Sequence, residues 1–299
     1  MTALLRAGYS VRIATRRSVQ FPNSVDEVII PDLVTPVDWK PILHDIDIVV
    51  HLAGLAHTNE SYFPFDEFDR INRIAALRLA DAAKKARVRH FIYISSVRAQ
   101  VAHFAAQIVR ERDKPQPTDQ YGRSKLAAER AIVSMNLPFT VLRPVVVYGP
   151  HPKGNFRTLV RLASLPLPLP VKGLTARRSL LGIDNLISAI IFVLDNQHAL
   201  GETFLVADPA SLTLNEIFTM LRKAQGRAPW LVYFPPFLIR RVFLLFGYSD
   251  LWERIGENLV VDTSNLESLG WRAPLDTIEG LTAMMLAEDG KASENDRGP

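Results

Sequence analysis

The 299-residue chain contains no cysteine, which excludes disulfide bonds, thiolate metal sites and cysteine nucleophiles. Because this composition suits a reducing compartment, we expect a cytoplasmic protein. The chain also lacks an apolar run of about 20 residues, the length that spans a bilayer. Its most apolar stretch, Trp230 to Tyr248, is interrupted by two prolines and two arginines. We therefore expect this stretch to pack in the core, in a lid or at a dimer surface, and we expect neither a signal peptide nor a membrane partner.

The charged residues are also not concentrated in any one region of the sequence. The formal net charge is +4, and the basic pairs are scattered along the chain rather than gathered in a stripe. This distribution favours small anionic ligands and argues against a nucleic-acid partner. The seven histidines show no metal-ligand spacing, so we expect no metal site. Hydrophobic residues make up 48% of the chain, enough for a large buried core.

The first half of the chain alternates two kinds of pattern. Short apolar or β-branched runs predict strands at 10–15, 27–30, 47–52, 90–95 and 139–142, and helical spacing predicts helices at 68–87 and 121–135. Strands separated by such helices are typical of parallel sheets. The fold class predicted is α/β, with a doubly wound, Rossmann-type parallel sheet.

The texture changes near residue 150, where prolines begin to alternate with leucines. We predict a dinucleotide-binding domain at 1–150 and a smaller C-terminal α/β domain at 151–289. The latter is expected to bind substrate and to return some segments to the first domain. Residues 290–299 lack an apolar face and are expected to form a flexible tail.

Tyr121 and Lys125 begin the helix predicted at 121–135 and share one of its faces. A phenol is a poor base at neutral pH because its pKa is about 10. A nearby ammonium favours the phenolate and would lower the pKa of the phenol, so the pair can exchange a proton with a sugar hydroxyl. Ser96 follows a predicted strand, and ligands bind at the carboxyl ends of parallel strands. A serine there can donate to a carbonyl oxygen and orient the tyrosine.

Four motifs occur in a fixed order. They are HLAG at 51–54, ISS at 94–96, YGRSK at 121–125 and RPVVVYGP at 143–150. Together they resemble the extended short-chain dehydrogenases/reductases, the family of nucleotide-sugar epimerases and dehydratases of the UDP-glucose 4-epimerase type. The similarity extends to RSLLGIDNL at 178–186 and VDTSNLESLGW at 261–271. It implies an enzyme that binds NADP or NAD and acts on a nucleotide-diphosphate sugar, with a UDP-sugar the expected substrate and a homodimer a possible assembly.

The resemblance also implies residue roles. Tyr121 is similar to the general acid/base, Lys125 to its electrostatic partner and ribose ligand, and Ser96 to the third catalytic residue, which also contacts substrate. Further residues implied to line the cofactor are His51, Leu52, Ala53, Pro144 and Val145. Asn72 resembles the helix asparagine that braces the active-site strands, and Asn155 and Arg178 resemble the residues that hold the nucleotide diphosphate.

The strand ending at Thr15 is followed by Arg16 and Arg17. NAD-preferring relatives usually carry an acid here for the ribose 2′-hydroxyl, whereas arginine accommodates a 2′-phosphate. The pair therefore favours NADP(H) over NAD. Asp32 and Leu33 resemble the pair that contacts adenine.

One departure from the family pattern concerns its first strand and glycine-rich turn, which have no counterpart in this sequence. Residues 1–8 resemble the end of the following helix, with Gly8 as its C-cap. In the strand order 3-2-1-4-5-6 the first strand is central. We therefore expect an N-terminally incomplete form of a longer protein, with weakened dinucleotide binding.

Three functions follow from these patterns. The first is a nucleotide-sugar 4-epimerase that works through a 4-keto intermediate. The second is an NADP(H)-dependent reductase or dehydrogenase acting on 4-keto nucleotide sugars. The third is a cofactor-binding protein without activity. We expect the first, because the Ser96, Tyr121 and Lys125 set is intact.

Overall fold

The computed structural model describes residues 1–18, 21, 25–56, 65–152 and 154–295. Contacts divide the chain into two units. The first comprises Met1–Ala99, Pro117–Arg143 and Ile190–Phe204, and the second comprises Gln100–Gln116, Pro144–Ala189 and Leu205–Pro299. The two units thus interleave along the chain.

The central sheet has the strand order β3-β4-β5-β9. Its strands are β3 (Ile48–His51), β4 (His90–Ile94), β5 (Phe139–Pro144) and β9 (Thr203–Val206). β4 pairs in parallel with both β3 and β5, and its five residues are all buried. A strand covered on both faces is expected to be apolar throughout, as HFIYIS nearly is. The predicted α/β class with a parallel sheet is confirmed.

Two strands near the N-terminus form a separate small sheet. β1 (Val11–Thr15) pairs in parallel with β2 (Val25–Ile29), in register from Val11 opposite Val25. Within the described ranges, no ladder joins this pair to the central sheet. A short helix, α1 (Thr2–Arg6), precedes β1 and is followed by Gly8 at φ 87°, while α2 (Trp39–Ile42) precedes β3.

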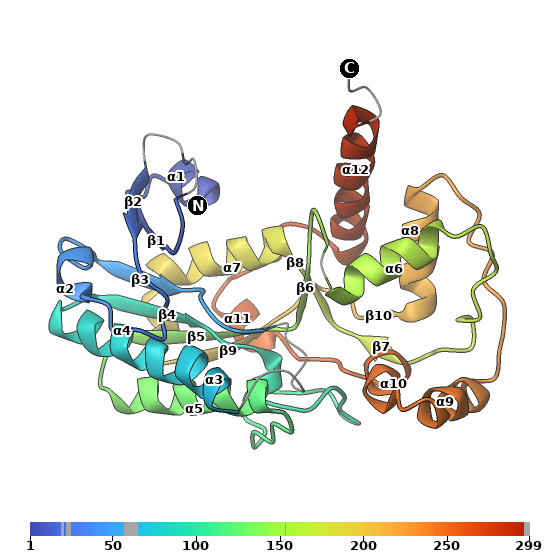
Figure 1. Ribbon diagram of the computed structural model, residues 1–299, viewed down its shortest axis with the longest axis horizontal. Helices are drawn as coiled ribbons and strands as arrows, with labels where there is room; N and C mark the ends of the chain where they lie inside the picture. Colours follow the sequence, from blue (N-terminus) through green and yellow to red (C-terminus); the bar gives the residue numbers. More distant parts are fainter. Residues whose placement is uncertain (19–20, 22–24, 57–64, 153, 296–299) are drawn as a thin grey trace. The chain divides into compact units, whose positions relative to one another are not determined.

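Helices α4 (Ala75–Lys85) and α5 (Gln120–Ser134) pack together on the central sheet, as Figure 1 shows. Small side chains of α4 face the core and permit a close approach to the strands. The shared cluster includes Ala76, Ala80, Phe91, Tyr93 and Ile132. The helix predicted at 68–87 is interrupted, because a π-helical stretch (Asp69–Ile74) separates α3 (Phe65–Phe68) from α4. Such widened turns recur at functional sites.

The second unit contains two short strand pairs. β6 (Val146–Tyr148) pairs in parallel with β8 (Leu180–Gly182), and β7 (Arg177–Arg178) pairs antiparallel with β10 (Leu212–Thr213). Its helices are α6 (Gly154–Ser164), α8 (Leu214–Ala224), α9 (Pro236–Leu245), α10 (Ser249–Gly256), α11 (Ser264–Ser268) and α12 (Thr277–Asn295). Helix α7 (Ile183–Asp195) starts in this unit and ends in the first. Thr213 caps α8 through a capping box with Glu216.

The C-terminal helix α12 includes part of 290–299, the segment expected to form a flexible tail. α12 continues to Asn295, and residues 296–299 lie outside the described part. Helix-favouring Ala, Glu and Lys residues extend the helix although they carry no apolar face. In the described residues, no helix is both long and apolar enough to cross a bilayer.

Candidate active site

Ser96 and Tyr121 meet beside the carboxyl end of β4. Ser96 lies two residues after the last residue of β4, and Tyr121 lies in the first turn of α5. The Ser96 hydroxyl lies close enough to Tyr121 to act on the pKa of its phenol. The backbone N–H of Arg98 donates to Ser96 Oγ at 3.2 Å, which fixes the serine on its short 3₁₀ turn. The sequence-predicted pair is therefore brought together.

The start of α5 is fastened to the segment that follows β4. Asp119 caps the helix by accepting from the Gly122 N–H at 2.5 Å, and it also pairs with the Arg98 guanidinium. A Cβ atom on Gly122 would collide with the Arg98 carbonyl oxygen. The glycine is thus required by close approach, and the position of Tyr121 depends on this contact.

Burial raises the pKa of the Tyr121 phenol above its usual value. The Ser96 hydroxyl and the charge of Arg98 oppose this rise without cancelling it. Our expectation that Lys125 would lower the pKa of this phenol is therefore wrong for this state of the protein, because loss of water outweighs the charges. The cation that favours the phenolate here is Arg98, a residue that the sequence motif did not single out.

Lys125 is buried one helical turn after Tyr121 in α5. Its Nζ donates to the Ile94 carbonyl oxygen at 2.9 Å and lies 4.8 Å from the centre of the Tyr93 ring. Burial lowers the pKa of Lys125 to about 8, although the charge of Glu129 raises it. The ammonium is still the main form at neutral pH, so a positive charge is held beside the end of β4.

A buried ion pair lies one helical turn farther along α5. Glu129 accepts from Arg143 Nε at 3.0 Å and Nη2 at 2.5 Å, and it also accepts from the Ser95 hydroxyl. All three side chains are nearly inaccessible to solvent. We call Ser95, Lys125, Glu129 and Arg143 the buried polar cluster. Our sequence reasoning missed Glu129, although its spacing of four from Lys125 was the available signal.

Asn72, on the π-helical stretch, joins three segments. Its side chain bonds both backbone groups of Leu55, at 2.8 and 3.1 Å, and donates to Ser124 Oγ at 2.9 Å. A Cβ atom on Gly54 would lie 3.1 Å from both Asn72 Oδ1 and Lys125 Nζ. The loop after β3 therefore runs close over the lysine, and only a glycine leaves this space open. The bracing role implied for Asn72 is consistent with these bonds.

His51 ends β3 as a neutral group. It stacks on the Tyr93 ring with centroids 5.8 Å apart, and its Nε2 has no hydrogen-bond partner. Burial, followed by the charge of Lys125, lowers the pKa of His51 to about 3. The next residues, Leu52 and Ala53, are exposed. Leu52 and Ala53 thus form an exposed apolar surface at the end of β3, close to the buried Lys125, and such a surface can accept a flat ligand.

The residues predicted to contact the adenosine half lie near β1 and β2. Arg16 pairs with Asp32 at 2.9 Å, and both side chains are largely exposed. The N–H of Val34, and then Arg16, lowers the pKa of Asp32. Arg17 is exposed, whereas Leu33 is half-buried and packs on the core cluster of this unit.

The other predicted residues belong to the second unit. Pro144 and Val145 are buried where β5 ends. Asn155 lies in α6, and its side chain is outside the described part. The Arg178 guanidinium donates to the carbonyl oxygens of Glu253, Glu257 and His103, at 2.8 to 3.2 Å. Burial, and then the charge of Arg254, lowers its pKa to about 10.

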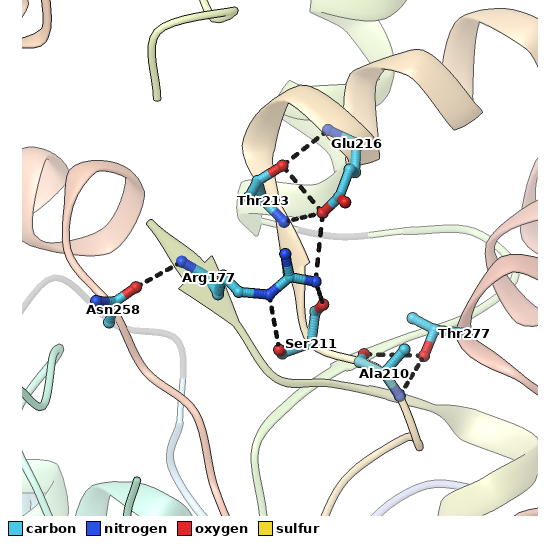
Figure 2. Close-up of polar contacts among 7 residues, drawn as sticks. All are labelled: Arg177, Ala210, Ser211, Thr213, Glu216, Asn258 and Thr277. Carbon is cyan, nitrogen blue, oxygen red and sulfur yellow. Dashed lines mark hydrogen bonds and ion pairs between the residues drawn. The ribbon is translucent and has the colours of Figure 1, made fainter. Parts of the chain in front are cut away.

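Arg177, the residue before Arg178, is also held by polar contacts, as Figure 2 shows. Arg177 Nε donates to Ser211 Oγ at 3.2 Å, its guanidinium pairs with Glu216 at 3.6 Å, and its backbone N–H donates to Asn258. These contacts hold β7 against β10. In the described part of the chain, no group of three or more side chains could hold a metal ion.

Comparisons with known proteins agree with this geometry. Residues 1–207 match the model of the NAD dependent epimerase/dehydratase family. The chain is 31% identical to a UDP-glucose 4-epimerase of Vibrio cholerae over 92% of this chain and 87% of the relative. It is 27% identical to a ceramide reductase of Caulobacter vibrioides over 63% of this chain and 54% of that protein. The structure of MoeE5, solved in complex with UDP-glucose and NAD, superimposes with a TM-score of 0.76 at 25% identity, covering 97% of this chain and 94% of that one.

Proposed function

Because the chain belongs to the NAD-dependent epimerase/dehydratase family, we propose that it is a UDP-sugar 4-epimerase that works through a 4-keto intermediate. The observation that carries this proposal is the approach of the Ser96 hydroxyl to Tyr121, with Lys125 buried one helical turn behind the tyrosine. The UDP-glucose 4-epimerase of Vibrio cholerae, 31% identical, supports the choice of reaction. The complex of MoeE5 with UDP-glucose and NAD supports the choice of ligands.

In the proposed reaction Tyr121 takes the proton of the sugar 4-hydroxyl and later returns it. Ser96 donates a hydrogen bond to the oxygen at C4 as that oxygen becomes a carbonyl. Arg98 supplies a positive charge that favours the phenolate, and the Lys125 ammonium would hold the ribose of the cofactor. A nicotinamide dinucleotide held by these residues would supply reversible hydride transfer at C4, so that no net oxidation occurs.

The residues at the end of β3 fit a nicotinamide nucleotide. The space above Gly54 that a Cβ atom would fill lies beside Lys125 Nζ, where a ribose hydroxyl can accept from the ammonium. We propose that His51, Leu52, Ala53, Pro144 and Val145 line the cofactor. We further propose Arg16, Arg17, Asp32 and Leu33 for its adenosine half, and Asn155 and Arg178 for the nucleotide diphosphate of the substrate.

The choice between NADP and NAD rests on the two arginines after β1. Arg16 is engaged by Asp32, whereas Arg17 is exposed and suits a 2′-phosphate. The complex of MoeE5 contains NAD and supports the other choice. Calorimetric titration of both cofactors separates these alternatives. If Arg17 binds a 2′-phosphate, Arg17→Ala weakens NADP and leaves NAD unchanged.

The second candidate is an NADP(H)-dependent reductase of 4-keto nucleotide sugars. The exposed Arg17 and the similarity to a ceramide reductase favour it. Incubation with UDP-glucose or UDP-galactose, and separately with a 4-keto nucleotide sugar and NADPH, distinguishes the two. An epimerase interconverts the sugars with no lasting change in nicotinamide absorbance, whereas a reductase consumes NADPH in step with a 4-keto substrate.

The direct test of the site is Tyr121→Phe. Loss of a positioned acid/base typically costs about 10²- to 10⁴-fold in rate, and we expect a fall in kcat of that size with the fold intact by circular dichroism. Tyr9→Phe, which removes a phenol that bonds Asp195, is the matched control. Undiminished turnover by the Tyr121 variant would contradict the proposed mechanism.

A further inference from the structure

The segment around α9 exposes apolar side chains that a folded protein normally covers. In α9 none of the residues is buried, and Leu245 and the following Phe246 are 82% and 72% exposed. Trp230, Tyr233, Phe237 and Tyr248 are each more than half exposed. We call the exposed side chains of residues 230–248 the apolar surface. It is contiguous along the chain and rich in aromatic residues, which marks an interaction site rather than scattered exposure.

Helix α9 is held to its unit by few residues. Ile239 and Phe243, four positions apart, pack on the core cluster of the second unit, and the Phe243 ring lies 6.5 Å from those of Tyr248 and Trp252. Figure 1 shows α9 beside α10, and the two helices are in contact. The rest of the circumference of α9, including Arg240 and Arg241, is exposed. A helix that is anchored along one narrow stripe presents its remaining faces to a partner.

Within the segment itself, charge has one sign. From Lys223 to Ser249 the sequence contains no Asp or Glu, and it contains Lys223, Arg227, Arg240 and Arg241. A second acid-free stretch, 151–183, pairs with it, because the N–H of Lys172 donates to the Val232 carbonyl oxygen at 3.2 Å. Lys172 is exposed beside the apolar surface. The next acidic residues along the chain are at 250, 253 and 257, and the first two belong to α10, the helix that contacts α9.

We propose that the apolar surface binds the face of an anionic phospholipid bilayer. Apolar side chains would enter the acyl boundary, Trp230, Tyr233 and Tyr248 would lie at the headgroup level, and Arg240 and Arg241 would pair with lipid phosphates. Basic residues near an anionic leaflet add attraction that salt screens. Several aromatic and aliphatic side chains together with a basic cluster supply the two signals that stable surface binding requires.

A second copy of the chain fits this surface less well. A two-fold interface places the same patch of each subunit against itself. Arg240 and Arg241 of each copy would then face those of the other, and neither copy offers an acid between residues 223 and 249 to neutralise them. A lipid phosphate layer neutralises the same charges. From the sequence alone we expected no membrane partner, because 230–248 cannot span a bilayer; exposure of its side chains is seen only in the fold.

The test is co-sedimentation of the 299-residue chain with vesicles. We expect binding to vesicles of equimolar phosphatidylcholine and phosphatidylglycerol, weak binding to phosphatidylcholine alone, and release by salt. Replacing Leu245 and Phe246 together by Glu removes two apolar side chains from the interface and should weaken binding at least about tenfold. Leu286→Glu, an exposed leucine of α12, is the matched control and should leave binding unchanged.

A second variant guards against misfolding. Arg240→Gln with Arg241→Gln keeps the apolar side chains and should weaken binding to anionic vesicles while removing most of its salt dependence. The proposal is overturned if the native chain ignores anionic vesicles, or if the Leu245/Phe246 variant binds as tightly as Leu286→Glu. It is also overturned if light scattering finds a dimer that the same substitutions dissociate, since a second copy then covers the surface.

Discussion

The buried polar cluster and the apolar surface depart from the usual distribution of polarity in opposite ways. The first places charge in the interior, and the second places apolar side chains in water. In the first unit, Lys125, Glu129 and Arg143 are charged residues with almost no solvent contact. In the second unit, Leu245 and Phe246 are apolar and almost fully exposed. Charged residues are rarely buried without partners, and large apolar patches are rarely left in water.

The difference between the two regions lies in how each departure is compensated. Glu129 is satisfied by Arg143 and Ser95, and Lys125 by a carbonyl oxygen and an aromatic ring, so the cost of desolvation is offset within the fold. Nothing in the described residues covers the apolar surface. Buried charges and exposed apolar patches are concentrated at sites where function opposes stability. Buried charges that have partners within the fold can serve a site inside the protein. Exposed apolar side chains that nothing covers require a partner from outside.

The largest change in stability is expected from Glu129→Ala. Removing one member of a buried ion pair typically costs about 3–5 kcal/mol, because Arg143 would keep its charge without a partner. Urea denaturation of the variant and the native chain measures the difference in the free energy of unfolding. Glu202→Ala, at an exposed position, is the control and should change this free energy by less than about 0.5 kcal/mol. A loss below about 1 kcal/mol for Glu129→Ala would show that the cluster is not closed to water.

A smaller loss is expected from Gly122→Ala. The added methyl group meets the Arg98 carbonyl oxygen, so α5 must shift away from the turn that carries Ser96. Overpacking of this kind costs about 1–3 kcal/mol, and it should also lower kcat because Tyr121 is the preceding residue. Gln120→Ala, in the same turn of α5, is the control for both measurements. If Gly122→Ala keeps both native stability and native activity, Gly122 does not lie as close to the Arg98 carbonyl oxygen as described.

Much of the first unit was predictable because its signals are local. The strands at β1, β3, β4 and β5 and the start of α5 follow from period and capping, and the approach of Ser96 to Tyr121 follows from strand ends meeting at one edge. The family was likewise predictable from motif order. These features depend on residues that are close in sequence or on the direction of parallel strands.

The rest depends on what surrounds a side chain, which a motif does not encode. Burial reverses the expected direction of the pKa of Tyr121, and the π-helical stretch forms where Asn72 bonds Leu55 and Ser124 from distant segments. Arg178 is occupied by three carbonyl oxygens that come from other segments of the chain. The exposure of Phe246 could not be read from the sequence, because composition predicts burial for such a run.

A pH profile sharpens the account of the buried polar cluster. The pKa of Lys125 is lowered to about 8, so its ammonium predominates below that pH and is lost above it. If the charge supports catalysis, kcat/KM should decline on the alkaline side with an apparent pKa near 8. Lys125→Arg keeps the charge at all accessible pH values, and any remaining activity should lack this decline. An unchanged alkaline limb in the arginine variant would assign the decline to another group.

The smallest effect is expected at the apolar surface. Leu245→Ala should change the free energy of unfolding by less than about 0.5 kcal/mol, because the side chain has almost no apolar contact to lose. Leu221→Ala, the same substitution at a fully buried position of α8, should cost about 2–5 kcal/mol. Denaturation of the two variants in parallel, at several protein concentrations, makes the comparison. A loss above about 1 kcal/mol at Leu245 that grows with concentration would mean that a second copy covers this surface in solution, and it would remove the contrast between the two regions.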